Sequence, residues 1–254
     1  CQGPTNLDLP RPISERSPMF RRPAKLVVAA LLAAATPFVI SDASAQSAQP
    51  GAAQPQPAPQ AQTDEVLAKV QAFYDSTKSF SSPFKQEFHV KSHNIRKESK
   101  GKVTFAKPGK MSWDYETPAG NRVVSDGNIL KVYEAANKQL FEQSVDKSQY
   151  PAALSFLTGK GSLSEAFTFV MYPGASMQFP GGNVLVGPPK QPPPAYTKVL
   201  LYVDSATSHV RRVLIVDAQG NRNRFDFIEP KVNIPVDENT FKLVPPPGTQ
   251  IIKP

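Results

Sequence analysis

Residues 101–145 read GKVTFAKPGKMSWDYETPAGNRVVSDGNILKVYEAANKQLFEQSV, and apolar and polar residues alternate along most of this stretch. Met111, Trp113 and Tyr115, for example, are separated by single polar residues. A period of two places the apolar set on one face of a sheet. Residues typical of turns interrupt the run at Pro108-Gly109, Pro118-Ala119-Gly120, Asp126-Gly127 and Ala136-Asn137. The stretch therefore predicts an antiparallel meander of at least five strands with one apolar face.

The N-terminal part has the pattern of an export signal. Residues 19–25 carry three basic side chains, residues 26–35 are apolar, and Ala43-Ser44-Ala45 offers the small residues that signal peptidase requires. The alternative, a transmembrane anchor, needs a longer apolar run, and Pro37 interrupts this one. We therefore expect cleavage after Ala45. The predicted divisions are residues 1–18, an upstream translation artefact; 19–45, the signal peptide; 46–62, a linker rich in Pro, Gln and Ala; and 63–254, the folded domain.

Composition narrows the class of protein. The single cysteine, Cys1, lies in the upstream segment, so the exported domain has no disulfide, no thiol nucleophile and no cysteine metal cluster. The formal net charge is +8, with basic and acidic residues interleaved rather than in blocks. We interpret this charge as favouring solubility and attraction to anionic membrane surfaces. A nucleic-acid partner is not expected for an exported protein.

Helices and further strands are predicted on both sides of the meander. A helix begins at Thr63, a suitable N-cap residue, and runs to about Lys78. A strand at 84–90 and a polar turn region at 92–99 follow it. After the meander we expect helices at 150–157 and 163–169, strands at 183–186, 198–204, 210–217 and 224–228, and a closing segment at 236–248.

About eleven strands in one sheet must curl or split. The fold class predicted is therefore mainly β: a strongly curled, unclosed antiparallel barrel with helices against its mouth.

Two groups of polar residues are candidates for chemical sites. His89 and His93 have a spacing that a metal site could use, but they lack a third ligand of clear placement. Asp114 and Glu116 share a strand face, yet they alternate with the apolar set and should face solvent rather than act as an acid/base pair. We expect no enzymatic activity, no metal and no cofactor.

Four motifs occur in order along the folded domain. They are Phe84-Lys85-Gln86, the run from Lys107-Pro108-Gly109 to Trp113-Asp114-Tyr115, the run from Val123-Val124-Ser125-Asp126-Gly127 to Val132-Tyr133, and Asp237…Phe241…Pro246-Pro247-Gly248. Over roughly residues 64–252, this ordered set resembles the LolA family of periplasmic lipoprotein carriers from Gram-negative bacteria.

The resemblance implies an unclosed eleven-stranded barrel with an α-helical lid over a hydrophobic cavity that holds lipoprotein acyl chains. Members of the family take acylated lipoproteins from an inner-membrane ABC transporter and deliver them to an outer-membrane acceptor. On this basis we expect a monomer in the periplasm. The alternative left open is a periplasmic lipid- or glycolipid-sensing protein on the same fold that transfers no lipoprotein.

Side chains for such a cavity should be apolar and able to repack, which suits aromatic residues and methionine. The sheet face and the helices supply them, although ordinary core residues would show the same pattern. The predicted lining is Phe73, Phe105, Met111, Trp113, Tyr115, Leu154, Phe156 and Leu157.

Lys107 is the predicted lid contact. The family commonly has an arginine before the proline at this point, and that arginine is thought to hold the lid through hydrogen bonds. An ammonium group lacks the planar fork of a guanidinium group, so we expect Lys107 to hold the lid more weakly.

Overall fold

The computed structural model describes residues 54–253, except 146–151, 160, 192 and 194. The chain divides into two units, Cys1–Gly51 and Ala52–Pro254, and only the second contains described residues. The predicted upstream segment, the signal peptide and residues 46–53 of the predicted linker lie outside the described residues, so these divisions stay predictions.

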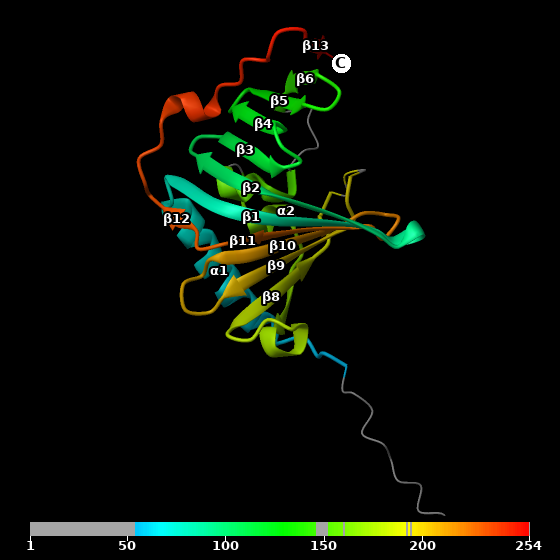
Figure 1. Ribbon diagram of the computed structural model, residues 1–254. Helices are drawn as coiled ribbons and strands as arrows, with labels where there is room; N and C mark the ends of the chain where they lie inside the picture. The colour runs from blue at the N-terminus through cyan, green and yellow to red at the C-terminus, as the bar shows by residue number, and fades with distance from the viewer. Residues whose placement is uncertain (1–53, 146–151, 160, 192, 194, 254) are drawn as a thin grey trace, which may run out of the picture. The chain divides into compact units, whose positions relative to one another are not determined.

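The described chain forms one large sheet (Figure 1). Its first group of strands is β1 (Ser79–Val90), β2 (Ile95–Ala106), β3 (Lys110–Thr117), β4 (Arg122–Asp126), β5 (Ile129–Glu134) and β6 (Gln139–Ser144). Its second group is β7 (Val170–Pro173), β8 (Gly182–Gly187), β9 (Lys198–Asp204), β10 (Val210–Val216) and β11 (Arg222–Phe227), followed by the short β12 (Lys231–Val232) and β13 (Gln250–Ile252).

The strand order is β13-β6-β5-β4-β3-β2-β1-β11-β10-β9-β8-β7, and β12 lies beside β1. All pairs are antiparallel except β13 with β6. Within the described residues the terminal strands β7 and β13 are not paired with each other, so the sheet does not close. The prediction of a mainly β, unclosed sheet with few helices is confirmed. Strands β1–β6 and β8–β11 overlap the predicted segments, whereas β7, β12 and β13 were not predicted. The predicted closing segment at 236–248 contains the 3₁₀ helix Glu238–Phe241 and no strand.

Helical segments cover one face of this sheet. They include α1 (Gln60–Ser76), η3 (Ala152–Thr158) and α2 (Leu163–Ala166), which share one buried apolar cluster with the strands. Other helical segments in the described residues are η1 (Lys91–His93), η4 (Gly174–Met177) and η5 (Glu238–Phe241). A second apolar cluster joins β4–β6 to the C-terminal segment, which Figure 1 shows in red between β12 and β13.

Helix α1 begins at Gln60, three residues before the predicted start. The Pro59 carbonyl accepts hydrogen bonds from the backbone N–H groups of Gln62 and Thr63, so the first turn forms ahead of Thr63. Thr63 is fully buried, and its hydroxyl oxygen accepts the backbone N–H of Met171 at 3.2 Å. The hydroxyl expected to cap the helix therefore joins the helix to β7.

The predicted polar turn at 92–99 is wrong, because β2 begins at Ile95. Strands β1 and β2 pair along their whole length, out to Val90 opposite Ile95, and form a hairpin that extends past its neighbours (Figure 1). Residues 95–98 are exposed, so polar side chains are tolerated on this part of the strand. The helix expected at 150–157 is instead the 3₁₀ segment η3, and α2 ends at Ala166.

Candidate functional site

All eight residues predicted to line a cavity meet in one apolar cluster between the sheet and the helical segments. Six of them are buried: Phe105, Met111, Trp113, Leu154, Phe156 and Leu157. Phe73 and Tyr115 are partly buried and pack against the cluster. The structure thus brings together residues from α1, β2, β3 and η3, whose side chains pack on one another. We call this packed set, with the residues that contact it, the apolar chamber.

Trp113 lies at the centre of the sheet side of the chamber and is 0% exposed. The strand register places it opposite Val103 on β2, while Met111 is opposite Phe105. Rings from three strands surround the indole, with centroid separations of 4.9 Å to Phe84, 5.2 Å to Phe225, 5.8 Å to Phe105 and 6.4 Å to Phe227. Most of these pairs are edge-to-face or tilted, which is a favoured geometry for aromatic rings.

Helix α1 contributes the other wall through Tyr74. Its ring packs edge-to-face on Phe156 at 5.0 Å. Its hydroxyl oxygen accepts the backbone N–H of Val210 at 3.1 Å. Burial raises the pKa of Tyr74, so the phenol stays protonated and neutral within the chamber. The buried hydroxyl group of Tyr74 therefore has a hydrogen-bond partner on the sheet.

Phe73 makes a second contact between the helix and the sheet. Its ring centroid lies 4.4 Å from that of His209, which is in the turn between β9 and β10. Burial lowers the pKa of His209, the positive charge of Arg211 lowers it further, and Asp204 opposes both. At neutral pH a neutral imidazole therefore packs on the phenylalanine ring.

Lys107 holds the C-terminal end of α1. Its ammonium Nζ donates hydrogen bonds to the carbonyl oxygens of Tyr74 and Asp75, at 2.5 and 3.0 Å. The last carbonyls of a helix lack intrahelical partners and carry partial negative charge, so a cation is well placed there. The stem of Lys107 lies against Gly159, where an added Cβ would come within 2.5 Å of the lysine Cε. One side chain therefore touches α1 and the residue that follows η3.

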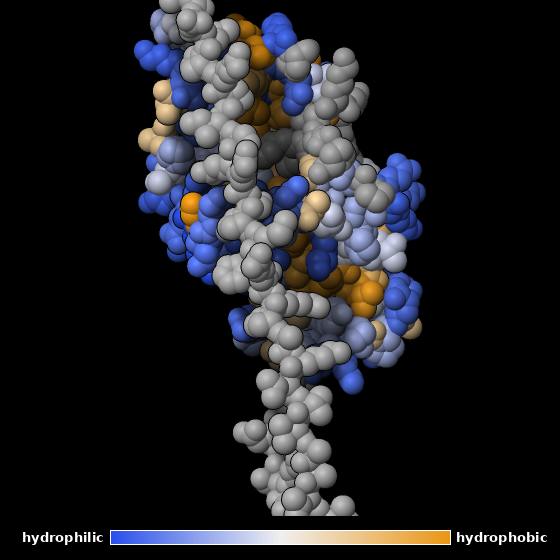
Figure 2. All heavy atoms as spheres, turned by 90° about the vertical axis from the view of Figure 1, so that its right-hand side faces the viewer, coloured by the Kyte–Doolittle hydropathy of each residue, from blue (hydrophilic) through white to orange (hydrophobic). Residues whose placement is uncertain are grey.

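The chamber becomes polar toward one end of β3. Two residues beyond Trp113, the Tyr115 hydroxyl donates to Gln86 Oε1 at 3.2 Å. Gln86 Nε2 in turn donates to Asn223 Oδ1 at 2.9 Å. We call Tyr115, Gln86 and Asn223 the polar trio. Figure 2 shows apolar side chains in a recess of the described surface with hydrophilic side chains around it.

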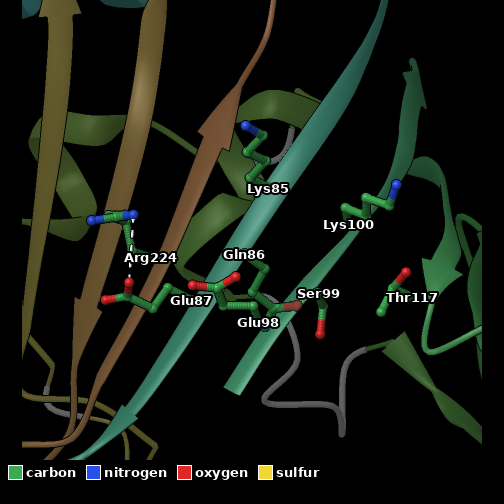
Figure 3. Close-up of a pocket in the computed structure, with 8 residues that line it drawn as sticks. All are labelled: Lys85, Gln86, Glu87, Glu98, Ser99, Lys100, Thr117 and Arg224. Atoms are coloured by element: carbon green, nitrogen blue, oxygen red, sulfur yellow. Dashed lines mark ion pairs between the residues drawn. The ribbon is translucent and has the colours of Figure 1, made fainter. Parts of the chain in front are cut away.

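A hollow of about 410 Å³ elsewhere on the sheet is lined mainly by charged side chains (Figure 3). Its lining comprises Lys85, Gln86, Glu87, Glu98, Ser99, Lys100, Thr117 and Arg224. Lys85 and Glu87 alternate with Phe84 along β1, so they point to the opposite face of the sheet from the chamber. Figure 3 shows Arg224 directed at Glu87, and Arg224 Nη2 lies 3.7 Å from Glu87 Oε2. Charged side chains dominate this hollow, so it does not suit an acyl chain.

The polar residues weighed as chemical sites have partners of their own. Asp114 forms an ion pair with Arg122 and accepts a hydrogen bond from Ser112 at 2.9 Å. Glu116 is exposed and lies 3.8 Å from Lys100. In the described part of the chain, no three His, Cys, Asp or Glu side chains gather in a group that could hold a metal ion. Over the same residues, every helix is too short or too polar to cross a bilayer.

Several chamber residues were not among those predicted. Phe225 and Phe227 alternate with charged residues on β11, so period two could have identified them. Tyr74 lies four residues after Val70, the helical spacing of the buried stripe, and it is more deeply buried than the predicted Phe73. Phe84 lies in the predicted strand at 84–90 but was not assigned to the site.

Comparisons with known proteins identify sequence relatives of this chain. Residues 75–244 match the sequence family described as "Outer membrane lipoprotein carrier protein LolA". The outer-membrane lipoprotein carrier protein of Alkalilimnicola ehrlichii is 29% identical over 199 residues, which cover 77% of this chain and 86% of that protein. The protein of the same name from Chromobacterium violaceum is 22% identical over 189 residues, covering 74% and 87%.

Solved structures with a similar fold include a LolA superfamily protein from Nitrosomonas europaea. It has a TM-score of 0.42 and 11% identity, over 70% of this chain and 97% of that one. An uncharacterised conserved protein from Thermus thermophilus has a TM-score of 0.46 and 13% identity, over 76% and 99%.

Proposed function

Because the chain belongs to the LolA family of outer membrane lipoprotein carrier proteins, we propose that it carries the acyl chains of lipoproteins through the periplasm. In this proposal it receives lipoproteins from an inner-membrane ABC transporter, hands them to an outer-membrane acceptor, and catalyses no reaction. The observation that carries the proposal is the apolar chamber, in which side chains from the sheet meet side chains from separate helical segments. Such a chamber can open by movement of the helices while the sheet stays intact.

The energetics of acyl burial suit a carrier of this kind. Burying a chain of ~16 carbons is worth about 12 kcal/mol at full transfer from water. In the unloaded protein, however, the chamber side chains already pack on one another. Loading exchanges these contacts for contacts with the acyl chain, so the net gain is smaller than full transfer. Affinity that is limited in this way allows the cargo to be released to an acceptor.

The direct test is to purify the protein from its own periplasm and to look by mass spectrometry for co-eluting triacylated protein. We expect wild type to carry it. Phe73→Asp should remain folded, because position 73 is only partly buried, but it should carry little cargo. Val244→Asp is the matched control, since Val244 is apolar but 88% exposed. Absence of acylated protein from wild type, or equal cargo in all three proteins, would contradict the proposal.

Lys107 is proposed to latch the helical segments over the chamber. Lys107→Ala removes both hydrogen bonds to the end of α1 and should speed the release of a fluorescent acyl ligand by about three- to tenfold. Lys107→Arg offers a planar fork to the same carbonyls and should slow release. Lys110→Ala is the control, because Lys110 pairs with Glu238 on the C-terminal segment and not with α1. Unchanged release rates in both Lys107 variants would mean that the residue is no latch.

A further inference from the structure

The indole N–H of Trp113 is buried and has no hydrogen-bond acceptor among the residues that the structure describes. Trp113 is the only tryptophan of the chain and is 0% exposed. A buried donor without a partner costs free energy, and natural proteins satisfy the great majority of such groups. An orphan donor at the centre of the chamber therefore calls for an explanation.

The surroundings of the indole contain aromatic rings rather than acceptors, with Phe84 and Phe225 among its ring contacts. The polar groups further along the strand are already engaged, because the polar trio is joined by hydrogen bonds within itself. The donor thus belongs to a ring packed among aromatic side chains, and the polar trio begins two residues further along β3, at Tyr115. A bound molecule with an acceptor at this depth would satisfy it.

We propose that the Trp113 indole N–H donates a hydrogen bond to an ester carbonyl oxygen of the bound diacylglyceryl group. This inference rests on the proposed function and specifies the chemistry of the cargo that the chamber prefers. An ester carbonyl is the acceptor that lies at the root of each O-linked acyl chain. Trp113 is therefore a specificity-determining residue, which distinguishes ester-linked chains from plain hydrocarbon or ether-linked chains.

The spacing along β3 agrees with this assignment. Trp113 and Tyr115 are two residues apart, so they are separated by about 7 Å along the strand. An ester carbonyl beside Trp113 places the glyceryl carbons and the modified cysteine toward the polar trio. The hydrocarbon then continues in the other direction, toward Met111 and Phe105. Polar parts of the cargo meet polar side chains, and apolar parts meet apolar side chains.

The single tryptophan makes a direct test possible, since it yields one indole N–H cross-peak in a ¹⁵N–¹H NMR spectrum. The protein is titrated with a diacylglyceryl lipopeptide and with the otherwise identical dialkyl ether lipopeptide. We expect the ester compound to move the indole proton downfield and to slow its exchange with water. The ether compound should bind without the downfield shift. The same indole response to both compounds would overturn the inference.

Affinity provides a second readout, measured by displacement of a fluorescent acyl probe. Wild type should bind the ester compound about five- to tenfold more tightly than the ether compound. Trp113→Phe keeps an aromatic ring but removes the donor, so it should bind both compounds equally. Equal binding of the two compounds by wild type, or an ester preference that survives in Trp113→Phe, would refute the role of Trp113 while leaving the carrier function standing. Failure of wild type to bind either compound would instead refute the carrier function, and this inference with it.

Discussion

Cross-linking position 73 to position 209 should abolish the uptake of acyl chains. Phe73 on α1 and His209 on the β9–β10 turn have ring centroids 4.4 Å apart, so this contact joins the helical cover to the sheet. In Cys1→Ser protein carrying Phe73→Cys and His209→Cys, a short bis-methanethiosulfonate reagent would link the two introduced thiols. The link would hold α1 against the β9–β10 turn. If loading requires α1 to move, the fraction of binding-competent protein falls and the apparent affinity falls with it, by about tenfold or more.

The measurement is uptake of a fluorescent acyl ligand before cross-linking, after it, and after the link is cleaved with a reductant. Uptake should be lost and then recovered, so each sample serves as its own reference for the two substitutions. The matched control is Lys131→Cys with Glu142→Cys, which lie opposite each other on β5 and β6. That link joins two strands and should leave uptake unchanged. Normal uptake by the protein linked at 73 and 209 would show that α1 does not gate the chamber.

Gly101→Ala should produce a large loss of stability, although this position lies outside the chamber contacts. A Cβ at position 101 would lie 2.0 Å from the backbone oxygen of Asp114 and 2.9 Å from the Cα of Tyr115. These are backbone atoms of β3, so no side-chain rotation can relieve the overlap. The pairing of β2 with β3 already shifts by one residue between Lys100 and Gly101, and there the two strands come close together. We expect a cost of about 3–5 kcal/mol, a large part of the stability of an ordinary domain.

Urea unfolding of the purified domain, followed by circular dichroism, would measure this cost. Gly181→Ala is the control, because Gly181 has a φ of +82° and nothing within 4 Å of an added Cβ. It should cost only the backbone penalty of a left-handed alanine, about 1–2 kcal/mol. Equal costs at the two positions would mean that β3 can move away from Gly101 without loss.

Alternation of apolar and polar residues correctly predicted the strand pattern of residues 101–145. Strands β3–β6 and the end of β2 lie where alternation placed them, and their turns lie at the predicted turn residues. These features are local: alternation depends on neighbouring residues, and turn chemistry depends on two to four of them. Local pattern also placed Met111, Trp113 and Tyr115 on one face, and the structure has them there.

Contacts between distant segments depend on how the whole domain packs. Pairing of β1 with β11 joins residues more than 130 positions apart, such as Phe84 and Phe227, and no local pattern encodes it. The same pairing brings Phe225 and Phe227 to Trp113 and thereby leaves its N–H without an acceptor among the described residues. The extension of β2 to Ile95 could not be predicted from alternation, because an exposed strand needs no apolar residues.

Lys107 illustrates both what sequence can identify and what depends on packing. Sequence resemblance marked the position, because the residue precedes Pro108 in a family motif. Its acceptors, the carbonyls of Tyr74 and Asp75, are backbone atoms whose availability depends on where α1 ends and how it lies on the sheet. The sequence gives the identity of the side chain. A hydrogen bond also requires that the donor and the acceptor lie within about 3 Å of each other. For residues more than 30 positions apart, that proximity is a property of the whole packed domain.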